Sequence, residues 1–220
     1  MIIRMFKGDT ELRELLRTVL EGIRSDFKDE RYSIELLAEK FHSFAKSGMG
    51  EQDLWAALVK AAVELTSAQS PGWEFIAARL LGASFKRELS GRLKLLGITD
   101  FYSKLCYLTE EKLYGDYILE HYTKEEIQEA EGFLCPERDH LFTFSGLDLL
   151  LKRYVIHSRS LEPLETPQEM FLGIALHLAM KEEKDRLCWV RRFYDMLSRM
   201  YVTMATPTLS NARKPYHQLS

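Results

Sequence analysis

Apolar residues recur along most of the chain at the spacing of an α-helix. The stripe from Leu12 to Ile23 has intervals of three and four residues, which is typical of an amphipathic helix. Ser70-Pro71-Gly72 predicts a break between two such helices, and residues 91–100 are less regular. The helices predicted by this periodicity cover about residues 12–23, 34–48, 51–66, 73–89, 116–121, 124–133, 147–154, 167–179 and 188–202.

Two of these helices carry start signals in the sequence. Thr123 and Glu126 have the spacing of a capping box, in which each side chain accepts a hydrogen bond from the other's backbone N–H. Thr166 and Glu169 repeat the pattern, with Pro167 at the first helical position, where its missing N–H is harmless. We expect helices to begin directly after both threonines.

Two segments do not follow the helical pattern. Residues 154–164 have a β-branched start, a polar middle and a proline, which favours a short β-hairpin. Residues 205–220 contain two prolines and many small polar residues, and we expect them to be extended. The predicted fold class is therefore mainly α, with a short β-hairpin and an extended C-terminal segment.

Composition supports a helical globular fold and excludes some function classes. Hydrophobic residues make up 46% and charged residues 29% of the 220 residues, which is ordinary for a globular chain. Only 12 glycines and 6 prolines occur, so helix breakers are few. The net charge of −3 gives no broad basic field of the kind that nucleic-acid binders show. We expect no nucleic-acid partner.

The cysteines and the chain start predict a reducing, cytoplasmic location. Cys106, Cys135 and Cys188 are far apart and odd in number, so no disulfide framework is implied. The N-terminal residues lack the apolar run of a signal peptide, and no apolar stretch approaches the roughly 18 residues of a membrane span. We therefore predict no membrane association.

No self-contained active site stands out from the residues alone. None of the six histidines lies four residues from another, and neighbouring pairs such as Glu125 and Glu126 point apart on a helix. Phosphate-binding and nucleophile-elbow motifs are absent from the sequence. We predict no metal site, and we interpret the three cysteines as buried inert thiols and Trp55 and Trp73 as core anchors.

The C-terminal segment is the most polar irregular stretch. Thr206, Thr208, Ser210, Asn211 and Ser220 place hydroxyls and an amide on a backbone stiffened by proline. Such groups, with backbone N–H donors, can hold phosphate oxygens. A polar linker without a ligand is the alternative interpretation.

Residues 205–220 resemble a stretch of the large, catalytic subunit of ribonucleotide reductase. Three further segments resemble the same family in the same order, over residues 51–81, 114–154 and 165–200, and the second of them is similar to the class I form. The resemblance covers about residues 33–220. The matching positions at the C-terminal end are Ala205, Thr206, Pro207, Thr208, Leu209, Asn211, Gln218, Leu219 and Ser220.

The resemblance implies a reaction and a set of partners. Enzymes of this family replace the ribose 2′-OH of a nucleotide by hydrogen, using a cysteine thiyl radical and reducing thiols, and so supply deoxyribonucleotides for DNA synthesis. In class I the radical comes from a separate small subunit that contains a metal, and the substrate is a ribonucleoside diphosphate. The family's Thr-Pro motif assigns substrate binding near the phosphates to Thr206, and its Ser-Ser-Cys segment assigns a further contact to Ser220.

The end of the chain departs from the family's pattern. The sequence stops at Ser220, before the expected Ser-Cys, so the redox cysteines and the catalytic barrel are not in it. We therefore expect no catalytic residue and no bound cofactor in this chain, and no activity without the C-terminal part of the large subunit, the small subunit and a thiol reductant. The predicted domains are a reduced or degenerate ATP-cone-like region without nucleotide binding (1–50), a helical domain (51–204) and the extended segment (205–220).

Several interpretations stay open at this point. A naturally split large subunit, a fragment cut at a domain boundary and a gene interrupted by a splicing element would each end a chain here. A different class of function is a non-catalytic helical interaction or regulatory module derived from the reductase. An adenosylcobalamin-dependent relative, which needs no small subunit, is less similar to residues 114–154.

Overall fold

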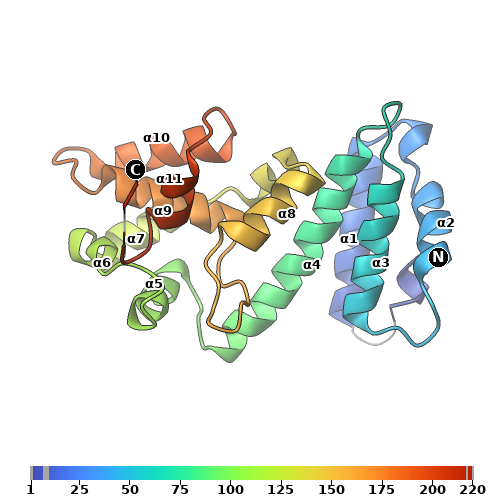
Figure 1. Ribbon diagram of the computed structural model, residues 1–220, viewed down its shortest axis with the longest axis horizontal. Helices are drawn as coiled ribbons and strands as arrows, with labels where there is room; N and C mark the ends of the chain where they lie inside the picture. The colour runs from blue at the N-terminus through green and yellow to red at the C-terminus, as the bar shows by residue number, and fades with distance from the viewer. Residues whose placement is uncertain (1, 7–9, 217, 220) are drawn as a thin grey trace. The chain divides into compact units, whose positions relative to one another are not determined.

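A computed structural model describes residues 2–6, 10–216, 218 and 219 (Figure 1). Within these residues the fold is mainly helical, which confirms the predicted class. The chain divides into two compact units: residues 1–87 with 142–148 form unit 1, and residues 88–141 with 149–220 form unit 2. The domain boundaries predicted after residues 50 and 204 stay predictions. Two helices pass from one unit into the other, α4 (Trp73–Leu95) and α8 (Phe144–Arg153).

Unit 1 is a helical bundle around an apolar core (Figure 1). Trp55 and Trp73 are 3% and 1% exposed in this core, which confirms them as core anchors. The indole Nε1 of Trp73 donates a hydrogen bond to the carbonyl of Arg31 at 3.0 Å, so its one polar atom is satisfied. The elements are η1 (Ile2–Arg4), α1 (Thr10–Asp26), η2 (Glu30–Tyr32), α2 (Ile34–Phe44), α3 (Glu51–Glu64) and the first part of α4.

Unit 2 is built around a helix that is buried over nearly all of its length, α9 (Pro167–Ala179). The helix α10 (Arg186–Ser198) packs along α9 and buries Val190 and Tyr194. Such an apolar helix is typical of the centre of a helical domain. The other elements, besides the end of α4 and most of α8, are α5 (Phe101–Glu110), α6 (Tyr117–His121), α7 (Lys124–Glu131), η3 (Pro136–Leu141) and α11 (Thr206–Asn211).

The helix starts follow their local signals. Both predicted capping boxes, at Thr123 and at Thr166, are formed with all their hydrogen bonds, which confirms these two starts. A third capping box between Asp100 and Ser103 begins α5, a helix that the periodicity did not predict. The irregular stretch predicted from residue 91 is wrong over its first part, because α4 continues to Leu95 and tolerates a glycine inside it.

The hairpin predicted over residues 154–164 is confirmed as a short antiparallel pairing. His157 and Pro163 form an antiparallel bridge, and the Ser158 N–H donates to the Glu162 carbonyl at 2.7 Å. Leu161 adopts a left-handed conformation with φ of 63° in the turn between them.

The C-terminal segment differs from the extended conformation that we predicted. Thr206–Asn211 form the short helix α11, after an extended Ala205 with φ of −63° and ψ of 151°. Pro207 lies in the first turn of α11, where the backbone N–H has no partner within the helix and proline costs nothing. Proline in a polar stretch therefore marks a helix start here. Among the described residues, none of the helices has the length and apolar character needed to cross a bilayer.

Candidate functional site

Thr206, the predicted substrate contact, is the first residue of α11 and is exposed. Its Oγ1 lies 3.2 Å from the phenolic oxygen of Tyr154, and either oxygen can donate. Tyr154 follows α8 and is 8% exposed, so a largely buried ring ends in a hydroxyl that touches Thr206. Thr206 is therefore an exposed residue whose hydroxyl contacts the hydroxyl of a largely buried tyrosine.

Arg213 follows α11 in the chain, and its side chain holds α11 in place through hydrogen bonds. Its side chain is fully buried, and its Nη1 donates to the carbonyl of Leu209 in α11 at 2.9 Å. Its Nη2 donates to the carbonyl of Tyr154 at 2.8 Å and to Oε1 of Glu165 at 2.7 Å. One guanidinium thus joins α11, the end of α8 and the residue that precedes the Thr166 cap.

Glu165 completes this arrangement from the start of α9. Its side chain is 1% exposed, and its Oε1 also accepts a hydrogen bond from the Ile156 N–H at 2.8 Å. The pair of Arg213 and Glu165 is therefore a buried ion pair that also satisfies backbone groups in an irregular region. Such pairing is what allows opposite charges to be buried at all.

Three further contacts fix the backbone after α11. The hydroxyl of Tyr117 donates to the carbonyl of Ala212 at 2.7 Å and lies 3.2 Å from that of Lys214. The Gly115 N–H donates to the carbonyl of Arg213 at 2.7 Å. A chain segment without regular structure satisfies its carbonyls in this way through side chains and loops of its neighbours.

The close packing of α9 against Arg213 requires a glycine at position 173. A Cβ atom added to Gly173 in α9 would lie 2.0 Å from Oη of Tyr114 and 2.5 Å from Cδ of Arg213. Both distances are far inside van der Waals contact, and Tyr114 is 1% exposed and closely surrounded. Arg213 and Tyr114 therefore occupy the space that a side chain at position 173 would fill.

Burial dominates the electrostatics of this cluster. It raises the pKa of the Glu165 carboxyl above its usual range, and the Arg213 guanidinium opposes that rise. Burial also raises the pKa of the Tyr114 phenol well above its usual value, and the charge of Glu165 adds to the effect. Within the described part of the chain, Tyr114 Oη, Glu165 Oε2 and Arg213 Nε have no hydrogen-bond partner.

The other predicted positions have mixed outcomes. Ser220, the second predicted substrate contact, lies outside the described residues. Among the other polar residues of this segment, the Asn211 amide donates to the Gln218 carbonyl at 2.9 Å, and Thr208 and Ser210 are half-buried. The substrate contacts assigned to Thr206 and Ser220 stay predictions.

The prediction of buried cysteines is wrong. All three thiols are free; Cys106 and Cys135 are half-buried, and Cys188 is exposed. The reason at Cys188 is that α10 turns Val190 and Tyr194 inward and leaves Cys188 on its outer side. Across the described residues, no group of three or more histidine, cysteine or acidic side chains could hold a metal ion.

The supporting residues could not be found from local sequence patterns. Arg213 and Glu165 are 48 positions apart, and Tyr154 is 59 positions from Arg213. The only local signal is an acidic residue directly before the Thr166 capping box. That signal does not identify a partner.

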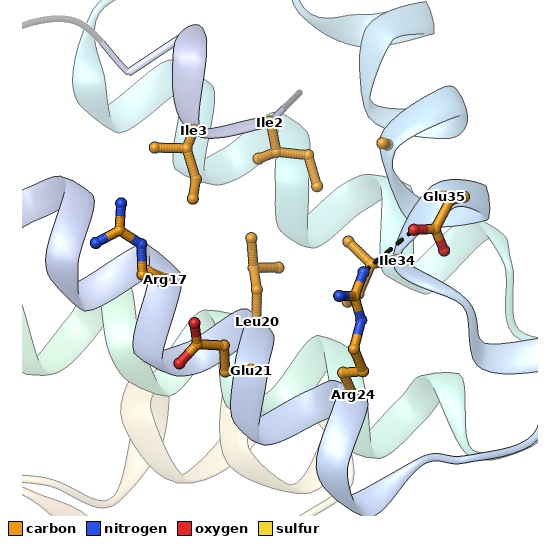
Figure 2. A pocket seen from close by; sticks show the side chains of 9 residues that line it. Ile2, Ile3, Arg17, Leu20, Glu21, Arg24, Ile34 and Glu35 are labelled. Atoms are coloured by element: carbon orange, nitrogen blue, oxygen red, sulfur yellow. Dashed lines mark hydrogen bonds and ion pairs between the residues drawn. The ribbon is translucent and has the colours of Figure 1, made fainter.

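Unit 1 contains a separate pocket of about 340 Å³ (Figure 2). Arg24 donates to Glu35 across it at 3.1 Å, and Arg17 and Glu21 lie at its side, so its rim carries equal numbers of positive and negative groups. The pocket therefore presents an apolar floor without an excess of positive charge. That floor is formed by Ile2, Ile3, Leu20, Ile34 and Ala38.

Comparison with known proteins agrees with the resemblance seen in the sequence. A family model of the ribonucleotide reductase all-alpha domain matches residues 140–217, which contain α8 to α11, Arg213 and Glu165. The match therefore includes the Thr206 segment and its buried support.

Relatives with a curated name extend the similarity to most of the chain. The ribonucleoside-diphosphate reductase subunit alpha of Treponema pallidum (strain Nichols) is 56% identical over 202 residues, which is 92% of this chain and 24% of the relative. The subunit alpha of Enterobacteria phage T4 is 31% identical over 84% of this chain and 24% of its own length. In Escherichia coli (strain K12), the ribonucleoside-diphosphate reductase 1 subunit alpha is 28% identical over 86% of this chain and 25% of its own length.

The chain spans about a quarter of the length of the curated relatives that it matches. Both the similarity over most of its residues and the family model point to the same group of proteins. The chain belongs to the ribonucleotide reductase family, as a relative of the alpha subunit of ribonucleoside-diphosphate reductase.

Proposed function

We propose that this chain is an N-terminal portion of the large, catalytic subunit of a class I ribonucleoside-diphosphate reductase. In this role it contributes part of the substrate site, and the thiyl-radical chemistry that converts a ribonucleoside diphosphate to its deoxy form is performed by the remainder of the subunit. The names of the relatives and the family model support the enzyme family. The 56% identity over 92% of the chain supports the assignment most strongly.

The observation that carries the substrate contact is the exposed position of Thr206 on a segment that Arg213 and Tyr117 hold in place. A threonine hydroxyl can donate a hydrogen bond to a phosphate oxygen, and such a bond to a charged group is stronger than one between neutral groups. The bond between Thr206 and Tyr154 orients the hydroxyl before a ligand arrives. Ser220 is proposed as the second contact, in line with the family's motif.

The proposed enzyme needs components that this chain does not supply. They are the C-terminal part of the large subunit with the catalytic cysteines, a small subunit that generates the radical with its metal, and a thiol reductant. Three free thiols agree with the reducing cytoplasm as the place of action.

The test compares Thr206→Val with Thr203→Val in the complete large subunit, assayed with the small subunit and a thiol reductant. Thr203 is exposed on the same segment and lies before α11, so it provides a matched control for the loss of a hydroxyl. Loss of a hydrogen bond to a charged phosphate is expected to lower kcat/KM for the diphosphate by about 10- to 100-fold in Thr206→Val. Thr203→Val is expected to remain at the wild-type value.

Three results would change the proposal. Equal kcat/KM in both variants would remove Thr206 from the substrate site. Nucleotide reduction without any small subunit would assign the chain to an adenosylcobalamin-dependent relative. If no combination of subunits reduces nucleotides, the chain is a non-catalytic helical module derived from the reductase.

A further inference from the structure

We propose that Arg213 and Glu165 are positioning residues, which together fix the place and orientation of the Thr206 hydroxyl. This inference rests on the proposed substrate contact of Thr206. It adds two buried residues and the hydroxyl of Tyr154 to the machinery, although none of the three is proposed to touch the reacting atoms.

The first argument is that Tyr154 contacts Thr206 through its side chain and Arg213 through its backbone. Its phenolic oxygen lies 3.2 Å from Oγ1 of Thr206, while its backbone carbonyl accepts a hydrogen bond from Arg213 at 2.8 Å. Arg213 also holds the carbonyl of Leu209 within α11 at 2.9 Å. The helix that carries Thr206 and the residue that its hydroxyl contacts are therefore attached to one guanidinium.

The second argument concerns the shape of that guanidinium. Arginine presents several donors in a rigid plane, whereas lysine presents a single point charge on a flexible stem. Here the donors reach three different acceptors, on Leu209, Tyr154 and Glu165, at 2.7–2.9 Å. A single ammonium group in this place could not keep all three directions, so the geometry calls for arginine.

The third argument is that this pair is poorly explained by stability alone. Both side chains are buried, at 0% and 1% exposure, and each keeps one polar atom without a partner among the described residues. A buried ion pair is often no more stabilising than apolar residues of the same size, and fixing one geometry is a reason to retain it. Gly173 and Tyr114 close the space around the pair, so Arg213 has little freedom to move.

The experiment measures kinetics in the complete reductase holoenzyme, with the variants Arg213→Lys, Glu165→Gln and Tyr154→Phe. Arg199→Lys serves as the control, because Arg199 is about half exposed and lies at the end of α10. A misplaced contact is expected to raise KM for the diphosphate by about 10-fold or more in Arg213→Lys. Tyr154→Phe removes only the hydroxyl and leaves the carbonyl that Arg213 binds, so it separates the two ends of the arrangement.

The decisive measurement repeats Arg213→Lys and Glu165→Gln in the Thr206→Val background. If the pair acts through Thr206, the substitutions at Arg213 and Glu165 no longer change KM once the Thr206 hydroxyl is gone, because the effects of coupled residues do not add. A purely structural role would raise KM by the same factor in both backgrounds, and that result would overturn the inference. An unchanged KM in Arg213→Lys, Glu165→Gln and Tyr154→Phe would also overturn it.

Hydrogen exchange of the complete large subunit supplies a readout that does not depend on catalysis. Amides between residues 207 and 214 are expected to exchange about 10-fold faster in Arg213→Lys than in Arg199→Lys. If exchange increases while Thr206→Val alone leaves kinetics unchanged, the proposed substrate contact has failed and the buried pair has not. If exchange stays at the control rate, the pair does not hold the segment, and the inference fails whatever Thr206 does.

Discussion

In unit 1 every buried residue among those described is apolar, whereas unit 2 buries seven polar or charged residues. In unit 1 the paired side chains of Arg24 and Glu35 are 67% and 76% exposed. The more buried Arg79 of this unit, at 12% exposure, pairs with Asp26, which is 51% exposed. In unit 2 the side chains of Lys104 and Glu169 are 4% and 14% exposed. The buried polar residues of unit 2 are Lys104, Asp139, Glu165, Gln168, His177, Ser198 and Arg213.

The difference in buried polar residues between the units indicates what buried charge does in this molecule. Unit 1 consists mainly of regular helices, and the side chains of Tyr32 and Trp73 bond to backbone groups of its loops without a buried charge. Unit 2 must also hold the stretch around α11. Tyr117 donates to the carbonyl of Ala212 in this stretch, and Arg213 of the stretch donates to the carbonyls of Leu209 and Tyr154. The buried pair of Arg213 and Glu165 therefore occurs where an irregular segment is held in one conformation, whereas Lys104 and Glu169 join two regular helices, α5 and α9.

The largest expected effect comes from Arg213→Met, which keeps the length of the side chain and removes the charge. Glu165 would remain buried without its partner, and such a loss costs about 3–5 kcal/mol of unfolding free energy. Urea unfolding of the chain, with hydrogen exchange to separate the units, would measure the loss in unit 2. Unit 1 is expected to keep its stability.

The double variant Arg213→Met with Glu165→Leu is the control for this prediction, because removing both charges should recover most of the loss. Burial raises the pKa of Glu165 and Arg213 is the group that opposes the rise, so an unpaired Glu165 should protonate easily. The folded state then binds a proton that the unfolded state has already lost, and the penalty of Arg213→Met should be smaller at about pH 5 than at about pH 7.5. A penalty that does not change with pH would contradict this account.

A smaller effect is expected for Lys104→Met. Nζ of Lys104 lies 2.6 Å from Oε1 of Glu169. The other oxygen of this carboxylate, Oε2, accepts a hydrogen bond from the Thr166 N–H at 2.7 Å and keeps it when the lysine is removed. Because Glu169 retains that partner, the expected loss is about 2–3 kcal/mol. In unit 1, Lys40→Met removes a similar contact at 2.8 Å from an exposed pair and should leave the unfolding midpoint unchanged within error. Equal losses in the two variants would remove burial as the cause of the contrast.

Alanine substitutions at one helical glycine in each unit would compare how tightly the two units are packed. Gly173→Ala would drive a Cβ into Tyr114 and Arg213, and we expect a net loss of about 1–2 kcal/mol after the gain in helix propensity. In unit 1, a Cβ on Gly82 would lie 3.6 Å from Leu147, an ordinary contact, so Gly82→Ala should stabilise the chain by about 0.5–1 kcal/mol. Thermal unfolding of both variants measures the two signs. A stabilising Gly173→Ala would mean that Tyr114 and Arg213 move apart freely.

Local signals explain how much of the fold could be predicted. The helices that start at Thr123 and Thr166 were predicted because their caps lie within four residues of sequence. The helix α5 was missed because its capping box uses Asp100 and Ser103 in place of the threonine and glutamate pattern. At α11 the polar composition favoured an extended chain, although Pro207 is equally suited to a first helical turn.

The candidate site was only partly predictable for a different physical reason. Thr206 could be found from its motif, whereas Arg213 and Glu165 meet only when segments 48 residues apart fold together. A lone arginine in a polar stretch is usually a solvated residue, and nothing near it in the sequence indicates full burial. Tertiary contact, not local propensity, therefore decides which charges support the site.

The smallest effect is expected for Arg24→Ala at the pocket of unit 1. Arg24 and Glu35 are both largely exposed and 3.1 Å apart, so water screens their attraction and two long side chains lose freedom in forming it. The expected loss is at most about 0.5 kcal/mol in urea unfolding, and it should shrink further at high salt, because exposed charges are screened. A loss above about 1 kcal/mol that persists at high salt would mean that unit 1 also depends on a specific ion pair. Both units would then gain stability from specific ion pairs, and they would differ only in whether those pairs are buried or exposed.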